Sequence, residues 1–366
     1  MEILNLPTAE QKERELRLLE KLAYPDAKPT DYSGSPGNNF LIAGTKENGF
    51  YGFVQPEEMG LILGNPDDKR QLTASNLALA IGLTQGTAIN EKTPWMKFSR
   101  KGKVLFVPVK PLRHTVSWDS IYKAGAVYGS DTIGVLPNKG RIGKRLSADA
   151  ATNSFTFNPA TAGEGFLHSA GRVGSVGDQI VTRGWPTAGN NGTFTITAIT
   201  DTSITVTGGS LTTETGDVDS SLYRKGDEVT QNAKKTIGDH QFRVRLLKGA
   251  SQDPLDSYVD ADRDLVGPES EWNSLILPLH EQAKLQNWAY AAYAGTTEDW
   301  GIGLSDADLS THYNLGLGSY SWCQETSDEV SQARVVRGYY GASFGTRYIS
   351  WLANSGFGWR PCLELI

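Results

Sequence analysis

Carboxylates at alternating positions are the pattern in this sequence that comes nearest to a metal site. Asp260, Asp262 and Asp264 stand at alternate positions, and Glu271 follows them. Oxygen ligands at positions 1, 3, 5 and 12 are those of a calcium-binding loop. Leu265 stands where such a loop needs glycine for its sharp turn. We therefore prefer to interpret this run as a solvated acidic loop, with a Ca²⁺ site as the alternative.

Other residues that could do chemistry stand in weaker patterns. No two of the five histidines have the spacing of metal ligands. Gly341-Ala-Ser-Phe-Gly345 matches the nucleophile elbow of serine hydrolases, but no histidine follows Ser343 in the order that those enzymes use. Asp299, Asp306 and Asp308 are carboxylates of the kind that a glycosidase pairs, and the sequence does not place them relative to one another. Structural roles are the preferred interpretation for all of these groups.

Aromatic side chains near the end of the sequence are the strongest candidates for a binding surface. Exposed Tyr and Trp rings offer stacking area to a sugar or a protein. Packing in the core is the competing interpretation, because Trp is highly buried on average. The candidate ligand-binding residues are Trp322, Tyr339, Tyr340, Tyr348 and Trp351.

Composition limits the class of protein. The chain has 366 residues, of which 39% are hydrophobic and 21% charged, as in a globular protein of two or three domains. Forty glycines among many Thr, Ser, Asn and Asp residues indicate a turn-rich, mostly β chain. A net charge of -6 argues against nucleic-acid binding. Without a long apolar run or a signal-peptide pattern at the N-terminus, we expect a soluble protein made in the cytoplasm.

Local signals predict several elements outside the middle of the chain. A capping box at Thr8–Gln11 and leucines at helical spacing predict a helix over residues 9–22, which packs on its own domain or on a neighbouring subunit. The run from Lys103 predicts a strand, and Pro108 marks its end or a sheet edge. Ser117 is the expected cap of a short helix. The apolar last residues predict a C-terminus built into the core.

The composition shifts between residues 146 and 225, where Thr, Ser and Gly dominate. Phe194, Ile196 and Ala198 alternate with threonines, which predicts a strand with one buried and one hydroxylated face. Asn191-Gly192 predicts a type I′ hairpin turn, and Asp201 begins a second predicted turn.

This shift in composition predicts an insertion. We interpret 146–225 as a small all-β, sandwich-like domain inserted into a core made of 39–145 and 226–366. Residues 1–38 form an N-terminal helix and linker in this interpretation. A surface loop tolerates such an insertion because the entropy of loop closure rises slowly with loop length.

Two segments resemble known families. Residues 176–209, with Gly177-Asp-Gln-Ile-Val and Ala188-Gly-Asn-Asn-Gly-Thr-Phe-Thr-Ile-Thr, are similar to a small β-domain that recurs in tail and other virion proteins of tailed bacteriophages. The last third resembles the formylglycine-generating-enzyme-like branch of the C-type lectin fold. It does so at Gly267-Pro-Glu-Ser-Glu-Trp, Arg334-Val-Val-Arg-Gly and Gly358-Trp-Arg-Pro. The resemblance implies an α+β, mostly β protein with a C-type-lectin-like core.

The chain departs from that enzyme branch at the residues that hold copper. The enzymes bind Cu(I) through a pair of thiolates near the end of the domain, because this ion needs soft ligands. Here Cys323 has no nearby partner in the sequence, and Cys362 belongs to the terminal strand. Whether these two cysteines form a disulfide with each other is left open by the sequence. We expect no enzymatic activity and no cofactor. The alternative is a formylglycine-generating-type or glycan-hydrolysing enzyme.

The resemblances imply a structural protein of a bacteriophage virion, in the tail, collar, fibre or capsid surface. Its expected partners are other virion proteins and copies of itself, and such homo-oligomers are usually symmetric. A host surface glycan or receptor is a further expected ligand. We expect no nucleic-acid partner and no membrane insertion. The expected location is the virion, assembled in the host cytoplasm.

Overall fold

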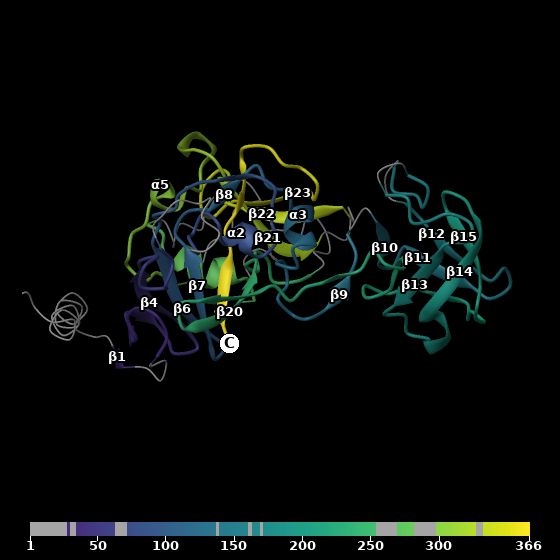
Figure 1. The fold of residues 1–366 in the computed structure, drawn as a ribbon, viewed down its shortest axis with the longest axis horizontal. Helices are drawn as coiled ribbons and strands as arrows, with labels where there is room; N and C mark the ends of the chain where they lie inside the picture. The colour runs from purple at the N-terminus through teal and green to yellow at the C-terminus, as the bar shows by residue number, and fades with distance from the viewer. Residues whose placement is uncertain are drawn as a thin grey trace, which may run out of the picture.

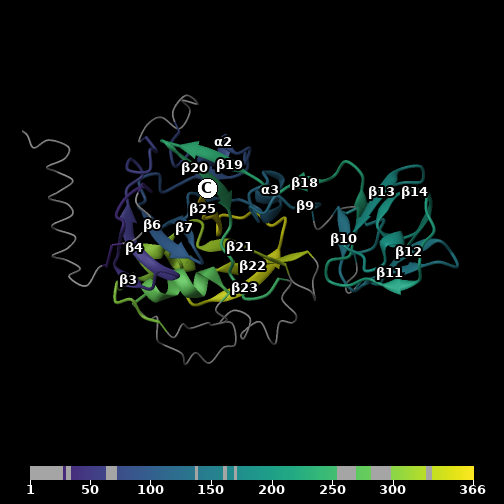
Figure 2. The ribbon, with the colours of Figure 1, turned by 90° about the horizontal axis from the view of Figure 1, so that it is seen from below.

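The computed structural model describes most of the chain after residue 33. The described residues are 34–62, 72–136, 139–159, 163–168, 171–253, 269–281, 298–326 and 332–366, with the backbone of β1 (Lys28–Pro29). The predicted N-terminal helix and Asp260, Asp262 and Asp264 lie outside them. Figures 1 and 2 show two lobes in two perpendicular views, a larger one and a smaller, teal one. We call them the core lobe and the small lobe.

The first sheet of the core lobe has seven strands, each antiparallel to its neighbours. In spatial order they are β19 (Lys234–Ile237), β20 (His240–Arg245), β25 (Cys362–Leu365), β7 (Lys103–Pro108), β6 (Trp95–Arg100), β4 (Asn48–Val54) and β3 (Ala43–Gly44). The last strand of the chain thus lies in the middle of this sheet, between segments far from it in sequence (Figure 1).

The second sheet of the core lobe has six strands, with one parallel pair, β21 and β24. In spatial order they are β23 (Gly345–Ile349), β22 (Ala333–Arg337), β21 (Tyr320–Thr326), β24 (Phe357–Trp359), β8 (Arg113–His114) and β5 (Thr87–Ala88). A separate pair joins β1 to β2 (Phe40–Leu41).

Two large hydrophobic clusters stabilise the core lobe. One lies between the sheets and includes Phe106 and Phe242 from the first sheet and Trp322 and Phe357 from the second. The other covers the opposite face of the first sheet and includes Trp272. The helices are short: α2 (Leu77–Ala80), α3 (Trp118–Lys123), the π-helix η2 (Trp272–Ile276), η3 (Leu277–Leu279), α5 (Asp306–Leu309) and η4 (Tyr313–Leu315).

The small lobe consists of one eight-stranded antiparallel sheet with its own hydrophobic cluster. Its strands are β10 (Gly140–Ile142), β17 (Ser221–Arg224), β13 (Gln179–Arg183), β14 (Gly192–Ile199), β15 (Ser203–Thr207), β12 (Ser154–Phe157), β11 (Leu146–Asp149) and β16 (Glu214–Thr215). The short η1 (Ala188–Asn190) precedes β14. The strands pair as a single sheet and not as the two separate sheets expected for a sandwich.

A pair of short strands connects the lobes. β9 (Ile133–Gly134) leaves the core lobe and β18 (Val229–Thr230) returns to it, with Gly134 opposite Val229. Among the described residues, no strand of the small lobe pairs with a strand of the core lobe. The strands of the small lobe all fall between residues 140 and 224, close to the bounds of the predicted insertion, 146–225. That this segment folds independently stays a prediction.

Several local predictions are confirmed. The protein is mostly β, with several antiparallel sheets and few short helices. Ser117 caps α3, with its side chain accepting the backbone N–H of Ser120. Pro108 ends β7, a central strand that lies away from both sheet edges. The turn after Asp201 joins β14 to β15, and β25 is a central strand.

The predicted type I′ turn at Asn191-Gly192 is wrong. Asn191 has φ -97° and ψ 128°, whereas this turn needs positive φ at both central residues. Eight residues, 184–191, connect β13 to β14, and the Asn191 amide bonds Trp185 and Thr187 within that loop. The side chain thus organises a longer connection than the dipeptide predicts.

The predicted alternation on β14 holds only in part. Phe194 and Ile196 are buried as expected, but Ala198 is exposed. A bulge between Ile196 and Ala198 inserts one extra residue, so the following Ile199 packs toward the core instead.

Candidate binding site

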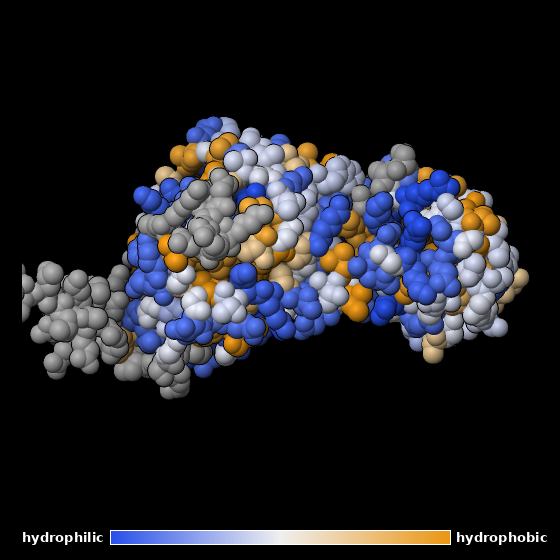
Figure 3. All heavy atoms as spheres, viewed as in Figure 1, coloured by the Kyte–Doolittle hydropathy of each residue, from blue (hydrophilic) through white to orange (hydrophobic). Residues whose placement is uncertain are grey.

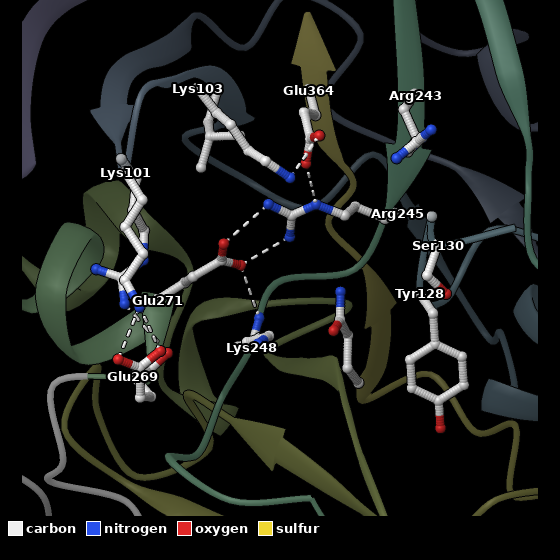
Figure 4. A pocket seen from close by; sticks show the side chains of 14 residues that line it. Lys101, Lys103, Tyr128, Ser130, Arg243, Arg245, Lys248, Glu269, Glu271 and Glu364 are labelled. Atoms are coloured by element: carbon white, nitrogen blue, oxygen red, sulfur yellow. Dashed lines mark hydrogen bonds and ion pairs between the residues drawn. The ribbon is translucent and has the colours of Figure 1, made fainter. Parts of the chain in front are cut away.

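A pocket of about 250 Å³ opens on the first sheet of the core lobe (Figure 4). Arg243, Glu364 and Leu105 follow one another across β20, β25 and β7 in direct register. Two pairs further along, Arg245 stands opposite Cys362, which belongs to the apolar cluster with Trp272 of η2. The pocket therefore lies where the apolar cover of this sheet face gives way to charged side chains.

Arg245 is the centre of the polar network in this pocket (Figure 4). Its two terminal nitrogens donate to both carboxylate oxygens of Glu271, at 2.7 and 2.8 Å. Its Nε donates to Glu364 at 3.1 Å, and Lys103 pairs with the other oxygen of Glu364 at 2.8 Å. Arg245, Glu271 and Glu364 are all buried. Such bidentate, charge-assisted bonds fix the position of both partners.

The same network decides the ionisation of Glu271. Burial opposes its charged form, but Arg245 outweighs this effect and holds the pKa of Glu271 below its ordinary value. The backbone N–H of Lys248 also donates to this carboxylate, at 3.0 Å. Glu271 is therefore a fixed anion that anchors both β20 and the turn after it.

Two further cations line the side of the pocket formed by the β6–β7 turn. Lys101 pairs with Glu269 at 2.6 Å. Arg100 donates to the side chains of Asn48 and Ser274 and to the carbonyl of Glu269. The exposed Lys101–Glu269 pair contributes little to stability, whereas the buried Arg100 is held in one geometry by three acceptors.

Arg243 and Lys248 line the pocket without a carboxylate partner inside it. Arg243 reaches the exposed Asp131 at 3.2 Å, and its buried Nε has no hydrogen-bond partner among the described residues. Gly129 packs directly on this arginine: with φ +60°, an added Cβ would stand 2.8 Å from the Arg243 Cδ. A side chain at this position would therefore displace Arg243.

The predicted aromatic residues do not form one site. Trp322 is fully buried, while Tyr339 and Tyr348 are half-buried and pack on the same cluster. Tyr340 is 47% exposed and Trp351 42% exposed. Tyr340 lies in the loop between β22 and β23, and Trp351 follows the far end of β23, so the two stand at opposite ends of this hairpin. Core packing explains Trp322, and of the five predicted residues the most exposed are Tyr340 and Trp351, at the two ends of the hairpin.

Four of the aromatic rings form a stack that runs from the core to the surface. Trp322 stacks on Phe357 at 4.7 Å between ring centroids, and Phe357 on Tyr320 at 4.9 Å. Tyr320 stacks on Tyr339 at 3.9 Å, and Tyr339 meets Tyr340 edge-on at 4.5 Å. The exposed Tyr340 is thus fixed by rings beneath it, as a rigid contact residue would be.

Other candidates from the sequence have structural roles. The Ser343 loop joins the antiparallel strands β22 and β23, whereas a nucleophile elbow joins a parallel strand to a helix. Asp308 completes a capping box on α5 with Ser305. Asp306 accepts bonds from Thr311 and from the backbone of Ala342.

The two cysteines are free and buried, so the disulfide left open by the sequence is absent. Cys323 packs with Val335 in a small cluster, and Cys362 lies in the cluster with Trp272. Burial raises the pKa of both thiols, that of Cys362 to about 12. Both environments therefore favour the neutral thiol over the thiolate that copper needs.

Sequence reasoning missed the charged pocket. The available signal was Arg243-Val-Arg245, which places two arginines on one face of a strand, together with the basic turn from Arg100 to Lys103. Their convergence depends on β25 pairing between β20 and β7. Because those strands are far apart in the chain, local patterns carry no information on their pairing.

Comparisons with known proteins identify no relatives. No family model, curated protein or solved structure matches the chain. In the described ranges, no group of three or more His, Cys, Asp or Glu residues could hold a metal ion. Of the helices that the structure describes, none has the length and apolar character to span a membrane.

Proposed function

We propose that this protein is a structural component of a tailed-bacteriophage particle, with the core lobe as a C-type-lectin-like frame and the small lobe as a projecting contact surface. The resemblance of residues 176–209 to a virion β-domain first suggested this class.

Support for the lectin-like frame comes from the residues that carry the resemblance. Trp272, Arg337 and Arg360 come from three separate motifs and meet in one buried cluster. The guanidinium carbons lie 5.8 and 5.6 Å from the Trp272 ring, within range of cation–π attraction. The two arginines donate to the carbonyls of Gly249, Val109 and Leu309. If the three motifs belong to one lectin-like fold, their side chains are expected to pack together in its core, as these three do.

The single observation that carries the proposal is the attachment of the small lobe. One pair of two-residue strands, β9 and β18, connects it to the core lobe, and Figures 1 and 2 show it standing away from that lobe. Much of its visible face is hydrophilic (Figure 3). Threonines such as Thr193 and Thr197 point outward from its sheet. A lobe held out on a narrow stem suits contact with a neighbouring subunit or a host surface.

Particle composition tests the proposal. An antibody against the recombinant chain should label purified phage particles, and quantitative mass spectrometry should find a fixed number of copies per particle. We also expect the recombinant protein to form a closed oligomer in light scattering. Particles that lack the protein while the infected cell contains it would refute a virion role.

The formylglycine-generating alternative makes a different prediction. It requires two thiolates close together, whereas Cys323 and Cys362 are buried in separate clusters that favour neutral thiols. Incubating the protein with Cu(I) and a cysteine-containing peptide provides the test. Oxidation of the peptide cysteine that is lost in Cys362→Ser would favour the enzyme.

A further inference from the structure

The charged pocket of the core lobe has a net charge opposite to that of the whole protein. Six basic and three acidic side chains line it, a formal excess of three positive charges. The chain as a whole carries a net charge of -6. A concave basic site on an acidic protein concentrates field lines and attracts an anion specifically to that place.

The ion pairs inside the pocket leave this excess uncancelled. Glu364 is shared by Arg245 and Lys103, Glu271 is held by Arg245, and Glu269 by Lys101. The three carboxylates are therefore neutralised by three of the six cations. Lys248 adds positive charge at the wall, and so does Arg243, which pairs at 3.2 Å with the exposed Asp131 outside the lining. The buried Nε of Arg243 is a donor with no partner among the described residues. An acidic group placed there would gain charge-assisted hydrogen bonds.

The remaining lining groups suit a hydroxylated ligand better than a bare inorganic anion. Glu269, Glu271 and Glu364 keep acceptor lone pairs, which repel an anion but accept hydrogen bonds from hydroxyl groups. Tyr128, Ser130 and Gln324 add neutral polar atoms to the lining. The volume of about 250 Å³ is below the roughly 300–1,000 Å³ of pockets for drug-sized molecules. One sugar ring with an acidic substituent matches both the size and the mixed polarity.

We propose that this pocket binds an acidic sugar residue, with its carboxylate or phosphate near Arg243 and Lys248 and its hydroxyl groups toward the glutamates. Gly129 packs against Arg243, and the Arg245–Glu271 ion pair fixes two further side chains in the wall of the pocket. The idea deepens the proposed function, because an acidic residue of a cell-surface polysaccharide would be a ligand for attachment. The pocket is separate from the predicted aromatic residues, none of which lines it.

Direct titration of the full-length protein tests the pocket. The probes are glucuronate and glucose 6-phosphate, which distinguish a carboxylate from a phosphate source, with glucose and inorganic phosphate as controls. In saturation-transfer NMR and calorimetry at low salt, we expect at least one acidic sugar to bind roughly ten times more tightly than either control. Its affinity should fall as salt rises. Equal binding of glucose, or no binding of either acidic sugar at millimolar concentration, would overturn the proposal.

Variants locate the bound sugar. Arg243→Gln and Lys248→Ala should each weaken binding roughly tenfold or more, since each removes a charged donor. Lys92→Ala, an exposed lysine of the core lobe outside the pocket, should bind as the wild type does. Circular dichroism verifies that each variant is folded. Wild-type affinity in both pocket variants would place the sugar elsewhere and refute the assignment.

The outcome is independent of the virion role. If the protein is absent from particles but glucuronate still binds in a manner sensitive to Lys248→Ala, the proposed function fails and the pocket stands. If the protein is present in particles and neither sugar binds, only the pocket assignment fails.

Discussion

The two lobes differ in how they satisfy the backbone of their loops. The core lobe buries Lys97, Arg113, Arg334, Arg337 and Arg360, each of which donates to backbone carbonyls. In the described part of the small lobe only Arg141 is buried in this way. Arginine carries five N–H donors, so one side chain can bond several loop carbonyls at once. The core lobe thus adds several buried cations to its strand pairing and apolar packing, whereas the small lobe adds one.

This contrast explains the different success of sequence reasoning in the two lobes. Alternation predicted the buried face of β14 up to its bulge, because period-two patterning directly reports a half-buried strand. In the core lobe, buried arginines such as Arg337 and Arg360 would count as surface residues by hydropathy. Only the motif resemblance singled them out.

The strongest test of the comparison is removal of a buried cation from the core lobe. Arg360→Ala leaves the carbonyls of Val109 and Leu309 without this donor and opens a cavity beside Trp272. We expect a loss of about 3–5 kcal/mol of stability, confined to the core lobe. Hydrogen exchange with mass spectrometry, read separately for each lobe, measures it. Lys92→Ala is the exposed control, and equal exchange in Arg360→Ala and the control would contradict the role of buried cations.

The matching experiment in the small lobe removes an apolar ring. Phe155 is fully buried and contacts Trp185 and Phe194. Phe155→Ala should cost about 3–5 kcal/mol through lost burial and the cavity left behind. Backbone hydrogen exchange should rise in strands β11 to β17, while the amides of the core lobe stay protected from exchange. Thr193→Ala, on the outer face of β14, should change stability by less than about 0.5 kcal/mol. If the core lobe lost protection as well, the two lobes would not be separate units.

These paired tests also bear on what the sequence can and cannot specify about the site. Arg243 and Arg245 lie two residues apart, so a basic strand face was predictable. Glu364 and Glu271 reach them only through the placement of β25 and η2, which are long-range features. The sequence singled out Trp351 and Tyr340 as candidate binding residues, but the length of the β22–β23 hairpin keeps them apart. Chemistry encoded within a strand is therefore predictable, and chemistry assembled between strands is not.

A smaller, pH-dependent effect is expected from one buried carboxyl of the core lobe. Burial, assisted by the neighbouring Asp253, raises the pKa of Glu325 from its ordinary 4.5 to about 8. The folded protein therefore holds this proton more tightly than the unfolded chain does. The free energy of unfolding should fall as pH rises from about 4.5 to about 8 and level off above that. Glu325→Gln should flatten this slope by up to a few kcal/mol, because each unit of pKa difference corresponds to about 1.4 kcal/mol.

The Glu325 experiment has a matched control at the surface. Glu57→Gln changes the same group at an exposed position and should leave the pH dependence as in the wild type. Urea titrations at several pH values, followed by tryptophan fluorescence, give both curves. If the free energy of unfolding depended on pH in the same way in Glu325→Gln and the wild type, Glu325 would be ionised in the folded protein despite its burial.

The smallest effect is expected when the whole small lobe is removed. Gly134 and Val229 face each other in the stem, so a two-glycine link can replace residues 137–226 and close a short hairpin. Leu136, which belongs to the core cluster, is retained. Shortening a loop changes its closure entropy by only about 0.6 kcal/mol for each halving, so the melting temperature of the core lobe should shift by no more than a few degrees. Calorimetry of the shortened chain, beside a variant with the same two glycines inserted after Gly226, measures this shift. A shortened chain that fails to fold would show that the lobes stabilise one another, and the contrast between them would then describe two halves of one cooperative unit.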